Sequence, residues 1–473
     1  ILAPLVALIL CFVPTVGPRR DPWGTFGDAR WMTARERRQM RVGLELGLEP
    51  GTQRPLRVST ESHLVTIAPP RTGKTSGLLI PNLCVPDNSA WFGPSVVIDP
   101  KGAAYRAVVD RRRQLGRTVR CLDPLGIAGG GDTWNPVTSL DPKDILYLHR
   151  VARALLPEPV PGEAAYFNNR AVPVIAGAFL AAHSVKRATP AFVSWLLSNV
   201  DEFEKYLAPL KGSAAASARS VLKMDSRSRD SILSTAAQAF SWCDDARLQR
   251  LTNTSSFSLA ELVTGNTDLF ITLPPEDLKT LTPLLRWLLC DLFTIVRRTR
   301  PLEPIICFID EAATMLGGYD NLLLDASELP GHNLRLWTFW QSRSQIIASL
   351  GEEGSKTLLN TAEFTTYSDL PLVDPDEREF LSRAIGDYTV LETVVTHDEN
   401  SKKKSFTTTP KAVRLMSADA VGQVSSTDLI VIPNSKRYAK RPSILRKTPY
   451  DDTRLKKHVA DLTTQATAAS TLT

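Results

Sequence analysis

Residues 63–83 read HLVTIAPPRTGKTSGLLIPNL, and this stretch decides the fold. Residues 64–67 are apolar and partly β-branched, which predicts a short buried strand. A tight loop follows, then Lys74 and Thr75, and then an apolar segment that predicts a helix. Strand, loop and helix in this order form a phosphate-binding P-loop, in which loop amides and the helix dipole bind phosphate oxygens. The sequence therefore predicts a nucleotide site here.

The P-loop motif gives a role to each position of the loop. Lys74 would act in catalysis against the β- and γ-phosphates, and the Thr75 hydroxyl would bind Mg²⁺. The predicted nucleotide-binding residues are Pro69, Pro70, Arg71, Thr72, Gly73, Lys74, Thr75 and Ser76. Ala68 departs from the motif, because a glycine is usual there. The alternative is a proline-rich turn that ends in Gly-Lys-Thr by chance.

A second motif follows about 230 residues later, in IICFIDEAATM at 305–315. An apolar run that ends in two acids is the Walker B pattern. Asp310 would hold the hydration shell of Mg²⁺, and Glu311 would orient the attacking water in catalysis. The alternative is a buried strand whose acids cap the next helix. Walker B is a weak signal alone, but it gains weight when a P-loop precedes it.

Two more polar residues stand at the ends of predicted strands. Asp99 ends the strand SVVIDPK at 95–101, and Gln341 follows the strand in RLWTFWQSRSQI at 335–346. Residues at the carboxyl edge of a parallel sheet lie beside the ligand crevice. Asp99 is therefore a further candidate for the metal, and Gln341 is a candidate catalytic sensor of the γ-phosphate. Ordinary turn chemistry is the alternative for both.

The composition is that of a soluble globular chain with more than one domain. A chain of 473 residues can bury a large core. The balance of 56 basic and 50 acidic residues suits nucleic acid or an anionic membrane surface, but it is too small to indicate either. The 6 cysteines show no metal-ligand spacing, so we expect reduced, buried thiols.

The pattern along the chain predicts an α/β fold with several parts. A nucleotide-binding domain would consist of residues 18–150, with Walker A, and residues 256–450, with Walker B. Residues 151–255 show helical apolar spacing and would form a mostly helical region that includes an all-helical insertion. Residues 451–473 are polar and would be a flexible tail.

Residues 1–17, ILAPLVALILCFVPTVG, carry no charge and precede an arginine-rich flank at 19–41. This order predicts a partial transmembrane segment with the rest of the chain in the cytoplasm. The run is slightly short for a spanning helix, and a signal-peptide remnant or a buried helix are the alternatives.

The polar stretch at 397–411 contains Lys402, Lys403 and Lys404 and predicts an exposed loop. These lysines would contact a DNA backbone, or they would only keep the loop solvated.

Together these motifs resemble the type IV coupling proteins, the TraG- and TraD-like membrane-anchored ATPases of conjugative DNA transfer and type IV secretion. The matching stretches lie within residues 24–452 and are GDARWMT (27–33), PPRTGKTSGLLIPNL (69–83), VVIDPKGAAY (96–105), WNPV (134–137), FIDEAATM (308–315), WQSRSQI (340–346), LIVIPN (429–434) and TPYDD (448–452).

The resemblance implies a RecA-like P-loop NTPase core with an inserted all-helical domain, and ATP and Mg²⁺ as cofactors. It also implies a homo-hexamer at the bacterial inner membrane with nucleotides between subunits. The implied partners are DNA, carried as a relaxase–DNA complex, the components of a type IV secretion channel, and the cytoplasmic membrane.

The function that we predict is ATP hydrolysis coupled to the recruitment and translocation of DNA or a DNA–relaxase complex. A FtsK/HerA-type pump for double-stranded DNA is one alternative, and a nucleotide-binding substrate receptor with little hydrolysis is another. In RecA-like rings an arginine of the neighbouring subunit commonly completes the site. Arg335, Arg343 and Arg383 flank the late strands and are the candidates for this role.

Overall fold

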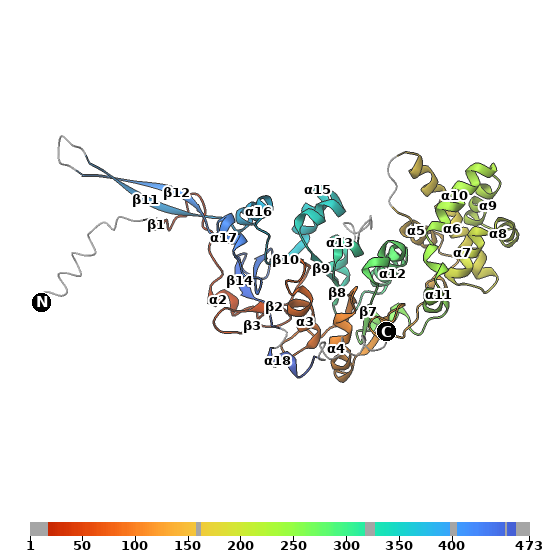
Figure 1. Ribbon diagram of the computed structural model, residues 1–473, viewed down its shortest axis with the longest axis horizontal. Coiled ribbons are helices and arrows are strands. Elements are labelled where there is room, and N and C mark those ends of the chain that lie inside the picture. Colours follow the sequence, from red (N-terminus) through yellow and green to blue (C-terminus); the bar gives the residue numbers. More distant parts are fainter. Residues whose placement is uncertain (1–17, 158–161, 317–326, 398–403, 450–451, 460–473) are drawn as a thin grey trace.

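A large mixed sheet runs through the middle of the molecule (Figure 1). The computed structural model describes residues 18–157, 162–316, 327–397, 404–449 and 452–459. The strands of this sheet are β2 (Leu44–Leu48), β3 (Pro55–Val58), β4 (His63–Ile67), β5 (Ser95–Ile98), β6 (Thr118–Leu122), β7 (Thr267–Ile271), β8 (Ile305–Ile309), β9 (Leu334–Trp340), β10 (Ala362–Tyr367), β13 (Asp428–Pro433) and β14 (Ser443–Arg446). Their order in space is β3-β2-β14-β13-β10-β4-β9-β8-β5-β7-β6.

The strands from β10 to β6 are all parallel to their neighbours. The strands from β3 to β13 pair antiparallel, and β13 joins β10 in the same way. Parallel strands need helical crossovers, which cover both faces of the sheet. The parallel part is therefore where the apolar strands predicted from the sequence lie.

Alternate side chains of the parallel strands serve two hydrophobic cores, one on each face of the sheet. In β8, Cys307 belongs to one core and the next residue, Phe308, belongs to the other. The helices that cover the sheet are α3 (Ile80–Cys84), α4 (Ala103–Gln114), α12 (Leu278–Thr299) and α15 (Arg343–Thr361). The first two pack on one face and the last two on the opposite face (Figure 1), as in other three-layer α/β folds.

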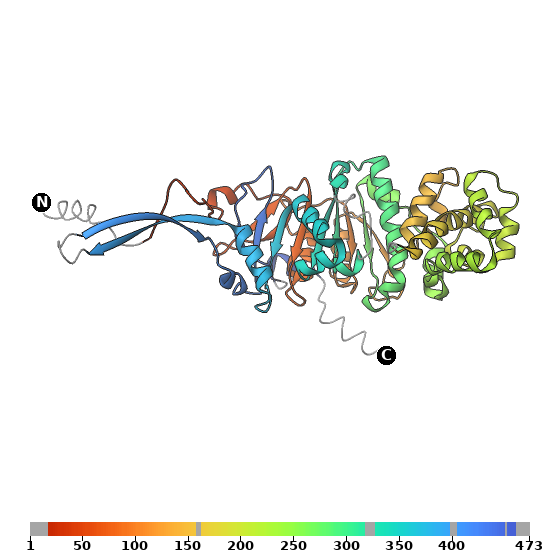
Figure 2. The same cartoon turned by 90° about the horizontal axis from the view of Figure 1, so that it is seen from above.

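A group of helices follows β6 and precedes β7 in the chain. They are α5 (Ile145–Leu155), α6 (Glu163–Ser184), α7 (Pro190–Ser198), α8 (Val200–Leu207), α9 (Ser213–Leu222), α10 (Ser226–Gln238) and α11 (Ala246–Asn253). They gather at one end of the molecule (Figure 2), where α6 contacts α5, α7, α8, α9 and α10. This stretch is helical, as its apolar spacing indicates.

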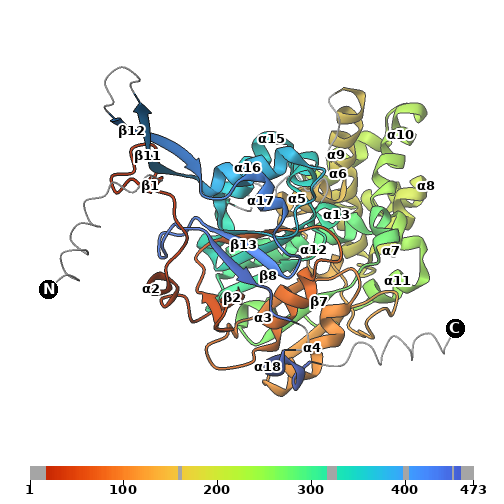
Figure 3. The same cartoon turned by 60° about the vertical axis from the view of Figure 1, so that its left-hand side comes forward.

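A long antiparallel hairpin projects from the other end of the molecule (Figures 2 and 3). It consists of β11 (Asp387–His397) and β12 (Lys404–Arg414), and β1 (Arg19–Arg20) pairs with β11. The prediction of an exposed loop at 397–411 is correct in that residues 406–411 are exposed, but His397 and residues 404–411 belong to strands and not to a loop. Threonine has a high strand propensity, but its polar side chain makes an exposed strand look like a loop in the sequence. Lys402 and Lys403 lie outside the described residues, and Lys404 is the first residue of β12.

The predictions for the two ends of the chain fall partly or wholly outside the described residues. The predicted membrane segment at 1–17 falls outside the described residues. Within the part that is described, no helix combines the length and the apolar character that a membrane span requires. The prediction of a flexible tail is wrong at its start, because Thr453–Lys456 form helix α18, capped by Asp452, and Leu455 is fully buried. From residue 460 onward the tail again lies outside the described residues.

The five cysteines in the described part of the chain are buried, and Cys84, Cys121, Cys243 and Cys307 are free thiols. This agrees with the expectation of reduced thiols.

Candidate nucleotide-binding site

The predicted site residues meet at one edge of the sheet. Strands β4, β9, β8 and β5 are neighbours and parallel, so their carboxyl ends lie side by side. The P-loop follows β4, Gln341 follows β9, Asp310 and Glu311 follow β8, and Asp99 follows β5. Strand order in space thus brings together residues that are far apart in the chain.

The P-loop connects β4 to η1 (Thr75–Leu79), a π-helical turn that α3 continues. Gly73 has a φ of 79°, a backbone conformation that favours glycine. Ala68, in contrast, has no positive φ, its side chain is buried, and its N–H donates a hydrogen bond to the carbonyl of Trp340 (2.9 Å). The loop therefore accommodates a Cβ at the position where glycine is usual.

Lys74 lies across the loop that carries it. Its Nζ donates a hydrogen bond to the carbonyl oxygen of Ala68 (2.8 Å), and the side chain is buried. Burial lowers the pKa of Lys74, while the negative charges of Glu311 and Asp310 oppose this shift. A nearby anion such as a phosphate would favour the charged form of Lys74 in the same way.

Two of the three residues predicted to bind Mg²⁺, Thr75 and Asp310, contact each other. The Thr75 hydroxyl donates a hydrogen bond to Oδ2 of Asp310 (2.7 Å). Burial raises the pKa of Asp310, and the contact with Thr75 opposes this shift. A hydroxyl and a carboxylate are oxygen ligands of the kind that Mg²⁺ prefers, alongside waters and substrate phosphates. The residues present therefore fit this ion.

Glu311 and Gln341 also meet. The Gln341 side-chain amide donates a hydrogen bond through Nε2 to Oε2 of Glu311 (2.8 Å). Glu311 has a φ of 53° and precedes helix α13 (Ala312–Met315), but its side chain makes no capping bond. The alternative that this acid only caps the helix is thus not supported. A positive φ in a residue other than glycine is a strain that clusters at functional sites.

A cavity of about 390 Å³ lies in front of these groups. Its lining includes Pro70, Arg71, Gly73, Lys74, Thr75, Ser76, Asp310 and Glu311, which are all predicted site residues. Lys101 also lines the cavity, as a third cation beside Arg71 and Lys74, and the sequence analysis gives it no role. Its place in DPKG, directly after a parallel strand, is the signal that could have identified it. Pro69 and Thr72 do not line the cavity, and the Thr72 hydroxyl donates a hydrogen bond to the carbonyl of Pro69 (2.8 Å).

Asp99 holds the turn that follows β5. Its Oδ1 accepts a hydrogen bond from the N–H of Lys101 (3.0 Å), and its Oδ2 accepts one from the N–H of Ala104 (2.6 Å), at the start of α4. Burial, with a contribution from the charge of Asp310, raises the pKa of Asp99 to about 6. The structure therefore supports the turn alternative for Asp99 over direct binding of the metal.

The three candidate arginines have different surroundings. Arg335 is only 8% exposed and lies at the amino end of β9, the end opposite Gln341, so burial removes it from the candidates. Arg343 packs over the ring of Phe380 (4.4 Å). Arg383 is exposed near the end of α16 (Pro375–Ile385), with an ion pair to Glu379 (2.8 Å).

Residues 29–471 match the model of the protein family described as type IV secretory system conjugative DNA transfer. Protein VirD4 of Rhizobium radiobacter is 23% identical to this chain over 346 residues, which cover 70% of this chain and 48% of VirD4. The chain thus spans about half the length of the curated relatives that it matches.

Solved structures share the fold. The unbound bacterial conjugative coupling protein TrwBdeltaN70 has a TM-score of 0.66 at 17% identity, with 91% of this chain and 96% of that chain covered. The plasmid coupling protein TrwB in complex with ADP and Mg²⁺ has a TM-score of 0.64 at 17% identity, with 90% and 95% covered. The large mixed sheet described above fits the RecA-like core that the sequence predicts.

Proposed function

Because this chain belongs to the type IV secretory system conjugative DNA transfer family, we propose that it is a coupling ATPase, which uses ATP hydrolysis to recruit and translocate DNA or a DNA–relaxase complex. One observation carries the proposal. Lys74, the Thr75–Asp310 contact and Glu311 converge on a single cavity at the carboxyl edge of the sheet, and Gln341, which does not line the cavity, binds Glu311 from outside it. These are the parts that phosphoryl transfer to water requires.

The side chains divide the chemistry between them. Lys74 and Lys101 place two positive charges beside the phosphates, where charge develops during the reaction. Thr75 and Asp310 would hold Mg²⁺, which supplies further charge neutralisation when bound. Gln341 donates a hydrogen bond to Oε2 of Glu311, so Oε1 of Glu311 is left to accept a hydrogen bond from the attacking water. The Gln341 amide thereby fixes the orientation of the carboxylate that places the water.

The proposal extends to the organisation of the chain. Residues 18–150 and 256–450 form one RecA-like domain, and the helices within 151–255 form an all-helical domain inserted between them. The element order supports this, because α5 to α11 interrupt the run of parallel strands between β6 and β7. Residues 1–17 belong to an inner-membrane anchor, as their uncharged sequence and arginine-rich flank indicate.

The assembled form would be a homo-hexamer with a nucleotide between adjacent subunits, next to a type IV secretion channel. Its cargo is DNA, delivered as a relaxase–DNA complex. A FtsK/HerA-type pump would act on DNA without a relaxase, and a receptor would bind nucleotide with little turnover. The contact of Glu311 with Gln341 favours hydrolysis over the receptor, because a receptor needs no residue to orient water.

Two substitutions test the ATPase. Lys74→Ala should abolish ATP turnover and weaken nucleotide binding, because it removes the main cation at the phosphates. Glu311→Gln should retain binding of Mg²⁺ and ADP but lower turnover by about a hundredfold or more, because it removes the group that orients water. Turnover is measured by phosphate release and binding by calorimetry.

Lys440→Ala is the matched control, since Lys440 is exposed and its one side-chain hydrogen bond to a described residue is with Oδ1 of Asn434 (3.3 Å). Turnover near that of the unmodified protein in Lys74→Ala would refute the site. Binding without measurable turnover in the unmodified protein, with and without DNA, would favour the receptor.

A further inference from the structure

Lys447 is a buried lysine on the outer side of the P-loop. It follows β14, and only 6% of it is exposed. Its Nζ donates hydrogen bonds to the carbonyl oxygens of Thr72, within the P-loop, and of Ser426 (2.6 Å). Lysine is rarely buried unless it is paired. Here backbone carbonyls are its closest partners, with Asp369 and Asp428 attracting it at longer range. A side chain that is so costly to bury needs an explanation.

The backbone around Lys447 packs directly on the first turn after the P-loop. A Cβ added at Gly77, in η1, would lie 3.2 Å from the Cβ of Lys447 and 3.3 Å from the carbonyl oxygen of Thr448. The N–H of Lys447 donates a hydrogen bond to the carbonyl of Thr427 (2.8 Å). The segment is thus close to the loop and is fixed from its other side.

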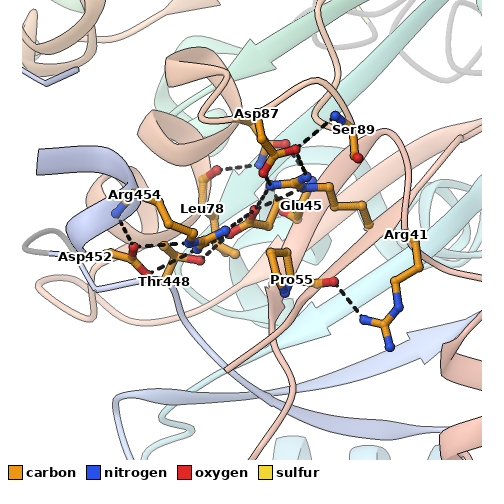
Figure 4. A network of polar contacts seen from close by, with 11 residues as sticks. Arg41, Glu45, Pro55, Leu78, Asp87, Ser89, Thr448, Asp452 and Arg454 are labelled. Atoms are coloured by element: carbon orange, nitrogen blue, oxygen red, sulfur yellow. Dashed lines mark hydrogen bonds and ion pairs between the residues drawn. The ribbon is translucent and has the colours of Figure 1, made fainter. Parts of the chain in front are cut away.

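A buried network anchors the same segment (Figure 4). The Thr448 hydroxyl donates a hydrogen bond to Oε1 of Glu45 (2.6 Å), and Arg454 donates one to the same oxygen (3.2 Å). Oε2 of Glu45 accepts a hydrogen bond from Arg57 (2.9 Å). Because Glu45 is buried and paired with two arginines, the residues that follow Lys447 are held firmly.

The network also reaches the helix that the P-loop opens. The N–H of Glu45 donates a hydrogen bond to Oδ1 of Asn82 (2.7 Å), and Nδ2 of Asn82 donates one to the carbonyl of Leu78 (2.7 Å). Glu45 therefore connects the segment at 447–454 to the end of the P-loop helix, while Lys447 contacts the loop itself. The loop and its helix are supported together from behind.

We propose that Lys447 is a positioning residue of the nucleotide site, which holds the P-loop in its phosphate-binding conformation through the carbonyl of Thr72. The inference rests on the proposed function of this site. The Thr72 carbonyl and the Gly73 N–H belong to one peptide group, and in a trans peptide they point in opposite directions. With the oxygen turned out to Lys447, the N–H points toward the cavity that Gly73 lines.

Lys447 acts on this peptide in two ways. An ammonium group on the carbonyl polarises the peptide, which makes the N–H a stronger donor toward a phosphate oxygen. The contact also fixes the orientation of the peptide before nucleotide arrives, so the loop loses less conformational freedom on binding. Burial and the charge of Lys74 lower the pKa of Lys447 to about 8, and a phosphate in the cavity would favour its charged form.

The test uses Lys447→Met, which keeps the aliphatic stem and removes the ammonium group. Binding of Mg²⁺ and ADP is measured by calorimetry, and KM and kcat for ATP by phosphate release. We expect Lys447→Met to weaken ADP binding and to raise KM, each about tenfold, as the loss of a hydrogen bond from a charged group would. We expect kcat to stay within about threefold, because the groups that orient water are unchanged. Lys447→Arg should recover most of the affinity, and Lys440→Met is the matched exposed control.

The outcomes separate this inference from the proposed function. If the unmodified protein binds no nucleotide, the proposed function fails. If it binds nucleotide and Lys74→Ala does not, while Lys447→Met matches the unmodified protein in affinity and KM, the role of Lys447 is refuted alone. A fall in kcat with unchanged KM would refute it as well. Should Lys447→Met lose its native circular dichroism, Lys447→Gln replaces it, and unchanged affinity there overturns the inference.

Discussion

At the scale of single residues, two buried aspartates show how their partners decide their charge. Burial raises the pKa of Asp268, but Arg112 (2.7 Å) and Arg117 (3.2 Å) outweigh it, so the pKa lies below its usual value. Asp291 of α12 is also buried, but it accepts a hydrogen bond from the neutral Tyr147 hydroxyl. Burial raises the pKa of Asp291 to about 7. The first aspartate is therefore ionised in the folded protein, and the second is protonated below neutral pH.

Asp291 should make the protein less stable as the pH rises. Its pKa is higher in the folded chain than in the unfolded chain, so the folded state binds the extra proton between about pH 4 and 7. Stability falls across this range, by about 2–3 kcal/mol between pH 5 and 8. Asp291→Asn cannot titrate and should show a smaller fall, in urea unfolding at both pH values. Asp99, with its pKa of about 6, lowers stability in the same direction in the unmodified protein and in Asp291→Asn. The contribution of Asp291 is therefore the difference between the two proteins in how steeply the free energy of unfolding falls with pH. Equal slopes would contradict the role of Asp291.

The sequence predicts a site residue correctly where a motif fixes its position. It does not predict a residue that reaches the site from a distant part of the chain. Lys74 and Asp310 stand at defined places in motifs after parallel strands, so their convergence follows from the fold. Asp99 has the same position after its strand, but one of its carboxylate oxygens accepts a hydrogen bond from the N–H of Ala104. Lys447 reaches Thr72 across 375 residues, and no local pattern indicates such a contact.

At the scale of elements, the sequence predicts the parallel strands well because both of their faces are apolar. It misses β2, LELGL, because a glutamate in a short strand resembles a surface pattern. Glu45 is buried only because Arg57 and Arg454, from other elements, pair with it. A charged residue in a core depends on partners that the local sequence does not show.

The packing of α6 on α9 depends on a glycine. A Cβ at Gly177 would lie 2.5 Å from the Cβ of Ala218, closer than two carbon atoms can approach. Separating the helices to relieve this clash should cost about 1–3 kcal/mol. Alanine is about 1 kcal/mol more favourable than glycine in a helix, so Gly177→Ala should lower the free energy of unfolding by up to about 2 kcal/mol. Denaturant unfolding measures the effect, and Gly331→Ala is the control, since its Cβ would meet open space. A more stable Gly177→Ala variant would show that the helices adjust freely.

At the scale of the whole molecule, the proposed ring needs an arginine whose side chain can extend from its own subunit into the nucleotide site of the neighbouring subunit. Arg343 is held over Phe380 and paired with Glu352 (3.0 Å), whereas the one ion pair of Arg383 with a described residue is an exposed pair within its own helix. Exposed pairs of this kind contribute little, so Arg383 is free to reorient. Arg383 is therefore the stronger candidate for completing the site of a neighbour.

Mixed rings test this assignment. Arg383→Ala alone should lower turnover by about a thousandfold or more, in the range known for arginines that act in trans. Rings coexpressed from Arg383→Ala and Lys74→Ala chains should recover part of the activity, because some interfaces combine an intact P-loop with an intact arginine. Coexpression of Arg383→Ala with a chain that carries both substitutions should recover none. Equal activity in the two mixtures would refute a trans role for Arg383.

The place of β14 has a consequence for how the chain is made. Residues 443–446 form an inner strand, which joins the antiparallel pair β2–β3 to β13 and the rest of the sheet. The ribosome releases β2 and β3 several hundred residues before their connecting strand β14 emerges. Contacts between such distant parts of a chain form slowly. Until β14 emerges, the edge of β2 that it will cover has no partner strand in this sheet, so the nascent chain is exposed to aggregation during that interval and a chaperone would protect it.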